Sequence, residues 1–107
     1  MNYQYIRFFS EIGIDDVDIV GGKNASLGEM YTELSREGVN IPNGFATTAE
    51  AYRDFLDHNE LVAPITAALD KLNVDDTKAL AKTGEYIRTL INQAAVPEAI
   101  VAEIEHA

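Results

Sequence analysis

The residues best suited to bind a ligand form one short run, Val20–Asn24, which reads VGGKN. Glycines without a Cβ atom let an anion approach the backbone, and a helix that begins here would offer N–H groups and a positive dipole end. Lys23 adds a mobile positive charge, and no other Lys or Arg lies between Arg7 and Arg36. A P-loop is excluded, because its first glycine and its Ser or Thr after the lysine are missing. The run predicts either a phosphate site, built by Gly21, Gly22 and Lys23, or a plain junction between a loop and a helix.

Histidines and clustered acids do not form a second site. His58 and His106 are far apart in sequence and have no carboxylate or cysteine partner at ligand spacing, so we expect both to be exposed. Asp15, Asp16 and Asp18 lack the glycine and the distal glutamate of a Ca²⁺ loop. We interpret the three as loop acids, and we assign no catalytic residue and no metal ligand to this chain.

The remaining polar candidates have simpler structural interpretations. Arg88 follows a helical glycine and is expected to form a partly buried ion pair. Ser26, Thr47 and Thr48 have no base within obvious reach, so helix caps and turn hydrogen bonds explain them best.

Length and composition describe one small acidic unit. The chain has 107 residues, of which 47% are hydrophobic, enough to build a modest core. Its formal net charge of -10 repels phosphate backbones and anionic lipid, so nucleic acid and membrane surfaces are poor partners. There is no cysteine, which excludes disulfides, thiolate metal sites and a cysteine nucleophile.

The ends of the chain suggest a cytoplasmic protein of greater length. Residues 1–7 contain no apolar run of signal-peptide length, and no segment reaches membrane-spanning length. The last predicted helix reaches Ala107 without a Gly, Asn or Pro terminator. We therefore expect an N-terminal part of a longer polypeptide, which would expose an apolar face and self-associate when isolated.

The first half of the sequence predicts short strands around one long helix. Residues 3–9 and, less clearly, 17–20 are expected to be extended. A helix is predicted over 24–36, and Gly38 suits the left-handed residue that ends it. Its inward positions are Leu27, Met30, Tyr31 and Leu34, whereas Glu29, Glu33 and Glu37 are expected on the wet side.

The second half is predicted to be helical after a turn at 42–44 and a strand at 45–48. Thr48 is expected to cap a helix that ends near His58 and turns Tyr52, Phe55 and Leu56 inward. Further helices are predicted over 61–72, from Asp75 or Asp76, and from Pro97. The helix that begins at Asp75 or Asp76 carries a narrow apolar stripe, formed by Leu80, Gly84, Ile87, Ile91 and Ala94. The fold class is α/β and helix-rich, with a few short strands from a sheet completed elsewhere.

Two blocks resemble the pyruvate phosphate dikinase family of phosphoenolpyruvate-utilising enzymes. Gly21–Met30 reads GGKNASLGEM, similar to the opening of that family. Val39–Ala49 reads VNIPNGFATTA, similar to its Pro-x-Gly-Phe-x-x-Thr segment. The wording of both blocks is closest to the water dikinase branch, and the resemblance runs through nearly the whole chain.

This resemblance implies the N-terminal portion of an ATP-grasp-type nucleotide-binding domain, incomplete over residues 1–107. Enzymes of this branch convert ATP, pyruvate and water to AMP, phosphoenolpyruvate and phosphate through a phosphohistidine, and they require Mg²⁺. Lys23 matches the family's phosphate-contacting lysine, and Gly21 and Gly22 would shape the loop around it. The Val-Arg-Ser-Ser segment, the acidic Mg²⁺ ligands and the histidine segment are expected beyond Ala107.

The implied partners are ATP, pyruvate and the remaining domains of the same polypeptide, and a homo-oligomer is left open. Alone, the chain is expected to be inactive and to bind ATP only weakly. One alternative is the N-terminal module of a rifampicin-type antibiotic dikinase, because the acceptor is chosen by domains outside this sequence. Another is a small acidic helical interaction module, in which the VGGKN run only begins a helix.

Overall fold

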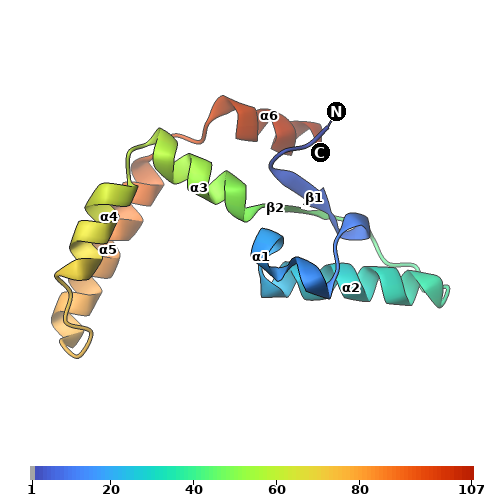
Figure 1. Cartoon of the computed structure of the whole chain (residues 1–107), viewed down its shortest axis with the longest axis horizontal. Coiled ribbons are helices and arrows are strands. Elements are labelled where there is room, and N and C mark those ends of the chain that lie inside the picture. Colours follow the sequence, from blue (N-terminus) through green and yellow to red (C-terminus); the bar gives the residue numbers. More distant parts are fainter. Residues whose placement is uncertain (1) are drawn as a thin grey trace. The chain divides into compact units, whose positions relative to one another are not determined.

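The computed structural model describes residues 2–107, and most of them are helical (Figure 1). The chain forms two compact units. The first unit runs from the N-terminus through Arg53 and also contains Glu98–Ala107. The second unit is Asp54–Pro97. The candidate phosphate-binding run therefore belongs to the first unit.

A short antiparallel sheet lies in the first unit. β1 (Ile6–Phe8) pairs with β2 (Phe45–Thr47), with Arg7 opposite Ala46. Both predicted strands are confirmed, although they are shorter than expected, because Phe9 starts the 3₁₀ turn η1 (Phe9–Glu11). Two strands of this length are marginal alone, so the sheet depends on the helices packed around it.

The segment before the long helix is helical, so the prediction of an extended piece at 17–20 is wrong. η2 (Ile14–Asp16) leads directly into α1 (Val17–Val20). The Asp16 carboxylate accepts the Gly13 N–H at 2.8 Å, and Gly21 N–H donates to the Val17 carbonyl at 2.8 Å. These two bonds close the turn from both ends and override the strand preference of the β-branched residues.

The long helix α2 (Gly22–Arg36) confirms the prediction for 24–36, and Gly38 follows it with a φ of 83°. The core of the first unit contains the buried side chains of Ile12, Val20, Ala25 and Ala46, with Phe9 packed against them. A Cβ atom at Gly28 would lie 2.5 Å from the Ile12 carbonyl oxygen. Gly28 therefore lets α2 lie directly against the backbone that precedes α1.

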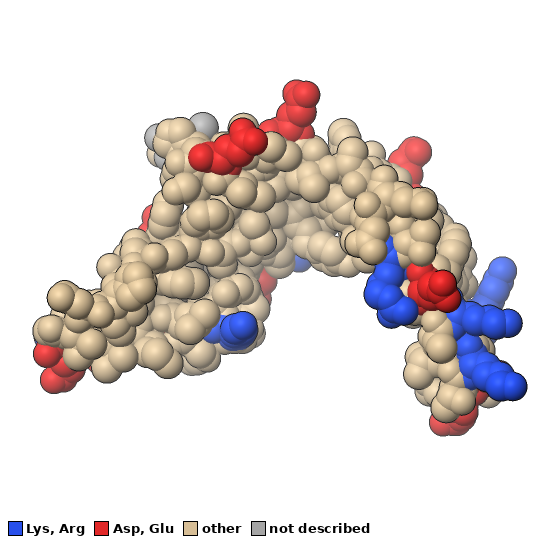
Figure 2. All heavy atoms as spheres, turned by 180° about the vertical axis from the view of Figure 1, so that it is seen from behind, with Lys and Arg blue, Asp and Glu red and all other residues tan. Residues whose placement is uncertain are grey.

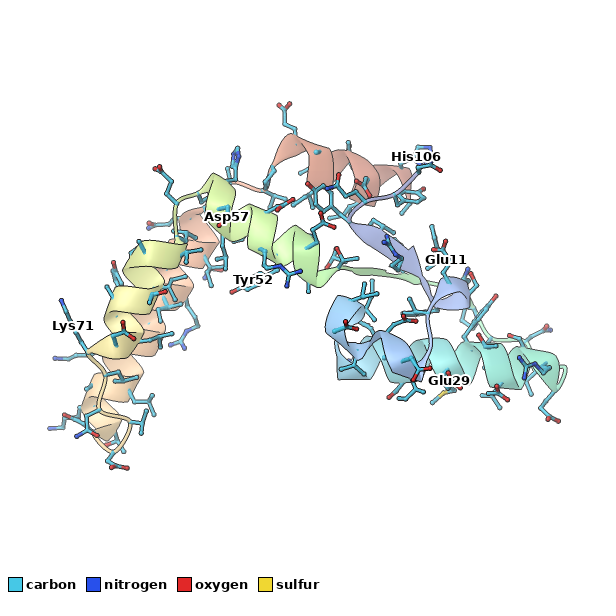
Figure 3. All side chains as sticks on the ribbon, viewed as in Figure 1. Glu11, Glu29, Tyr52, Asp57, Lys71 and His106 are labelled. Carbon is cyan, nitrogen blue, oxygen red and sulfur yellow. The ribbon has the colours of Figure 1, made fainter. Side chains whose placement is uncertain are left out.

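Two side chains of α2 differ from the predicted inside and outside positions. Glu29 is not on the wet side: it is partly buried, and its Oε2 accepts the Ile14 N–H at 3.1 Å (labelled in Figure 3). Met30 is 51% exposed instead of inward. The inward face of α2 is thus rotated toward η2, since that segment covers it.

The last helix, α6 (Glu98–His106), completes the first unit. Glu103 is buried, and its Oε1 accepts the Tyr5 N–H at 2.8 Å. Tyr3 and His106 are hydrogen-bonded at 2.6 Å between the hydroxyl and Nδ1. These contacts join residues that are about a hundred positions apart in sequence, which periodicity could not predict.

The second unit contains α4 (Val62–Asp70), α5 (Thr77–Gln93) and the last residues of α3 (Ala49–His58). Asp76 caps α5 as predicted, with its Oδ1 accepting from Lys78 N and Ala79 N. The Asn59 amide donates to the Phe55 and Ala95 carbonyls and accepts the Ala95 N–H. That amide holds the end of α3 against the end of α5. Pro64 lies in the first turn of α4, as expected.

Three further predictions about side chains and turns are wrong. Tyr52 is 53% exposed, because the inward face of α3 is centred on buried Ala51. No turn forms at 42–44, since Phe9 N–H donates to the Gly44 carbonyl and the segment runs beside η1. Arg88 is exposed, forms no ion pair with a described residue, and lies over Gly84 of its own helix.

Candidate phosphate-binding site

The candidate site is the corner between α1 and α2. Gly21 takes a φ of 85° and a ψ of 162°, a conformation that strongly favours glycine. Its N–H donates to Val17, and its carbonyl accepts the first bond of α2, from Ala25 N–H at 3.0 Å. Gly21 is therefore the N-cap residue of α2, and Gly22 and Lys23 are its first two helical residues.

The start of α2 is open toward solvent. No described side chain caps it, and its first turn contains no acidic residue. A Cβ atom at Gly22 would meet nothing within 4 Å, and the φ of Gly22 is not positive. The packing of the described residues therefore does not require a glycine at position 22. A ligand that approaches the backbone from outside would require one.

Lys23 places its charge at this open helix start. The side chain is exposed and forms no ion pair with any residue that the structure describes. A cation at the positive end of a helix dipole is locally unfavourable, by about 0.3–1 kcal/mol. A bound anion would remove this cost, because it would be attracted by the ammonium group and by the helix N–H groups together.

Asn24 was not predicted to have a role, and it holds the corner together. Its side-chain Nδ2 donates to the Val20 carbonyl at 3.0 Å. The bond links the last residue of α1 to the first turn of α2 across both glycines. The only sequence signal was the position of Asn24 four residues after Val20.

A pocket of about 240 Å³ lies between α1, which leads into the corner, and the start of α3. The residues that line this pocket are Arg7, Asp18, Ile19, Thr48, Ala49, Glu50 and Arg53. Arg7 is held by its own backbone, since its Nη1 donates to the Tyr3 and Ile6 carbonyls. Sequence reasoning missed this pocket because the tertiary fold brings residues 7 and 53 together. Lys23 is not part of its lining.

The distribution of positive charge sets Lys23 apart from the other cations. The second unit contains Lys71, Lys78, Lys82 and Arg88, and on the face drawn in Figure 2 blue atoms gather over the α4–α5 part. The first unit contains Arg7, Lys23, Arg36 and Arg53. Among these four, Lys23 alone lies in the first turn of a helix of at least eight residues.

The two histidines are exposed, and Thr48 is a helix cap, as the sequence predicts. His58 is exposed, and exposed His106 contacts Tyr3. Within residues 2–107, no three His, Asp or Glu side chains come together as a metal site. Thr48 caps α3, since its Oγ1 accepts the Ala51 N–H at 3.2 Å. Over the same residues, no helix combines the length and the apolar character that crossing a bilayer requires.

Comparison with known proteins agrees with the resemblance carried by the two blocks. Residues 17–107 match the family described as "Pyruvate phosphate dikinase, AMP/ATP-binding domain". A protein of Pseudomonas aeruginosa named phosphoenolpyruvate synthase is 52% identical over 97% of this chain, and one of Neisseria meningitidis with the same name is 53% identical over 96%. A third, from Escherichia coli, is 52% identical over 80% of the chain.

These relatives are much longer than the chain. The chain spans 13% of the length of the Pseudomonas and Neisseria proteins and 11% of the Escherichia protein. The family match covers the α1–α2 corner and every element that follows it. The chain belongs to the pyruvate phosphate dikinase AMP/ATP-binding domain family.

Proposed function

We propose that the corner Gly21–Lys23 binds a phosphate group of ATP, within an enzyme that makes phosphoenolpyruvate from pyruvate. The carrying observation is the open start of α2, where no described side chain caps the helix and no described residue forms an ion pair with the Lys23 ammonium group. The family match supports a nucleotide as the ligand. The names of the relatives support the synthase reaction.

In this proposal each residue of the corner has a distinct task. Gly21 supplies the left-handed turn that aims the first N–H groups of α2 outward. Gly22 leaves room for a phosphate oxygen to reach those groups. Lys23 neutralises charge on the phosphate, and such positioning and neutralisation are most of what phosphoryl transfer needs from a protein.

The complete reaction converts ATP, pyruvate and water to AMP, phosphoenolpyruvate and phosphate through a phosphohistidine, as part of gluconeogenesis in the cytoplasm. We assign the phosphohistidine, the pyruvate site and the rest of an ATP-grasp-type fold to sequence outside residues 1–107. The described residues bring no three His, Asp or Glu side chains together, so they do not supply a Mg²⁺ cluster. Any Mg²⁺ ligands would come from the same outside sequence, and the isolated chain is expected to be inactive.

A matched pair of lysine variants tests the phosphate site in the complete polypeptide that carries this chain. Lys23→Ala is expected to weaken ATP binding about 10- to 100-fold, because a charged hydrogen bond is lost. Lys78→Ala is the control, since Lys78 holds the same second helical position in α5, where Asp76 caps the helix. Unchanged ATP affinity in Lys23→Ala, or an equal loss in Lys78→Ala, would contradict the proposal.

A rifampicin-type acceptor is the second candidate, because the acceptor site is outside this chain. The names of the relatives favour pyruvate. The two candidates differ in product: the complete enzyme should form phosphoenolpyruvate when ATP and pyruvate are supplied, and it should leave rifampicin unmodified. Phosphorylated rifampicin with no phosphoenolpyruvate would reverse the choice.

A further inference from the structure

The side chain of Asn24 restricts the backbone of the corner between α1 and α2. Two consecutive glycines have more conformational freedom than any other dipeptide, so Gly21–Gly22 alone would not hold one direction. The two backbone bonds of Gly21 fix its own peptide groups. Asn24 adds a third bond, from its Nδ2 to the Val20 carbonyl, which spans both glycines.

This bond ties the corner to the core. Val20 is 6% exposed and packs with Ile12, Ala25 and Ala46. The bond also satisfies a carbonyl at the end of α1, where helix carbonyls lack partners within the helix. The buried position of Val20 therefore fixes the position of Asn24, the residue directly after Lys23.

We propose that Asn24 is a positioning residue for phosphate binding: it fixes the backbone from which Lys23 reaches the phosphate. This inference rests on the proposed phosphate site. An amide is suited to the task because it donates a hydrogen bond without adding charge. An aspartate of the same shape has no donor for the carbonyl and would repel the phosphate.

The proposal differs from direct contact between Asn24 and the phosphate. One N–H of the Asn24 amide donates to Val20, and the second N–H is the group that a direct contact would use. If Asn24 acts through Lys23, its removal has little further effect once Lys23 is gone. If Asn24 touches the phosphate itself, the two losses add, and a double-mutant cycle separates these cases.

The test measures the Kd for ATP of the complete polypeptide, well below its Tm, in Asn24→Ala, Lys23→Ala and the double variant. Asn24→Ala is expected to raise the Kd about three- to tenfold, the effect of one hydrogen bond. In the Lys23→Ala background the same change is expected to raise it less than twofold. Asn24→Ser, whose hydroxyl can donate to a carbonyl four residues back, is expected to keep more affinity than Asn24→Ala.

Asn59→Ala is the matched control, because Asn59 Nδ2 also donates to the carbonyl four residues back, that of Phe55. It is expected to lower the Tm at least as much as Asn24→Ala and to leave the Kd for ATP unchanged. The positioning role is overturned if Asn24→Ala binds ATP like the unmodified protein while Lys23→Ala does not. Additive losses, or equal affinities of Asn24→Ser and Asn24→Ala, also overturn it. If Lys23→Ala itself binds ATP normally, the proposed phosphate site fails first.

Discussion

At the scale of single residues, two glycines of the same helix have opposite explanations. A Cβ atom at Gly28 would collide with the Ile12 backbone, whereas one at Gly22 would meet nothing. Gly28 is therefore required by packing, and Gly22 is available for a ligand. The role of a glycine cannot be assigned from the sequence letter alone, because both kinds of glycine occur within seven residues of this chain.

Alanine at each position should separate these two roles. Gly28→Ala is expected to destabilise the complete polypeptide by about 1–3 kcal/mol, because the Ile12 backbone must move. Gly22→Ala is expected to keep or slightly raise stability, since alanine is the better helix residue. Chemical denaturation measures the first effect, and ATP titration is expected to show weaker binding for Gly22→Ala.

The glycine assignment would be wrong if Gly28→Ala were as stable as the unmodified protein. It would also be wrong if Gly22→Ala bound ATP with full affinity. In either case, the space available for a Cβ atom at Gly22 and Gly28 would not explain why these positions are glycine.

At the scale of elements, the segment from Ile12 through α1 lies on α2 through a few specific contacts. Glu29 accepts the Ile14 N–H, Gly28 admits Ile12, and Asn24 binds Val20. These three residues lie in the N-terminal half of α2. Together these contacts hold the corner in place.

Loss of the Glu29 carboxylate should loosen η2 without unfolding the first unit. Glu29→Ala is expected to cost about 0.5–1.5 kcal/mol and to speed hydrogen exchange at the Ile14 amide. Glu33→Ala is the control, because the Glu33 side chain forms an exposed ion pair with Arg36 at 3.3 Å, and the loss of such a pair should change stability little. Equal exchange rates at Ile14 in both variants would show that the Glu29 contact does not hold η2.

Local signals predicted the helices with strong caps, and tertiary contacts decided the rest. Thr48, Asp76 and Gly38 mark ends that the structure confirms. The helix at 17–20 was missed, because its stability comes from bonds by Asp16 and Gly21 and not from propensity. The candidate site is predicted only as three consecutive residues, because sequence spacing does not show the contacts of Asn24, Glu29 and the core that support the corner.

At the scale of the whole molecule, the chain leaves large apolar side chains exposed. Those in the first unit include Ile14, Val17, Met30 and Tyr52, all between 47% and 53% exposed. Where such side chains are contiguous, they mark a surface that another part of a protein covers. The relatives, of which the chain spans 13% or less, have ample sequence for such a cover.

The isolated chain should therefore behave as an incomplete protein. It is expected to self-associate with rising concentration, as measured by light scattering, and to form no AMP from ATP and pyruvate. The complete polypeptide is the control and is expected to form AMP. A chain of residues 1–107 that stays monomeric and turns over ATP would contradict this expectation.

The central claim is that Lys23 recognises phosphate, and a comparison of ATP with adenosine tests it most directly. The complete polypeptide is titrated with both ligands, with and without the change Lys23→Ala. We predict that the change weakens ATP binding about 10- to 100-fold and leaves adenosine binding within twofold, because adenosine has no phosphate. An unchanged preference for ATP over adenosine in Lys23→Ala would contradict the account.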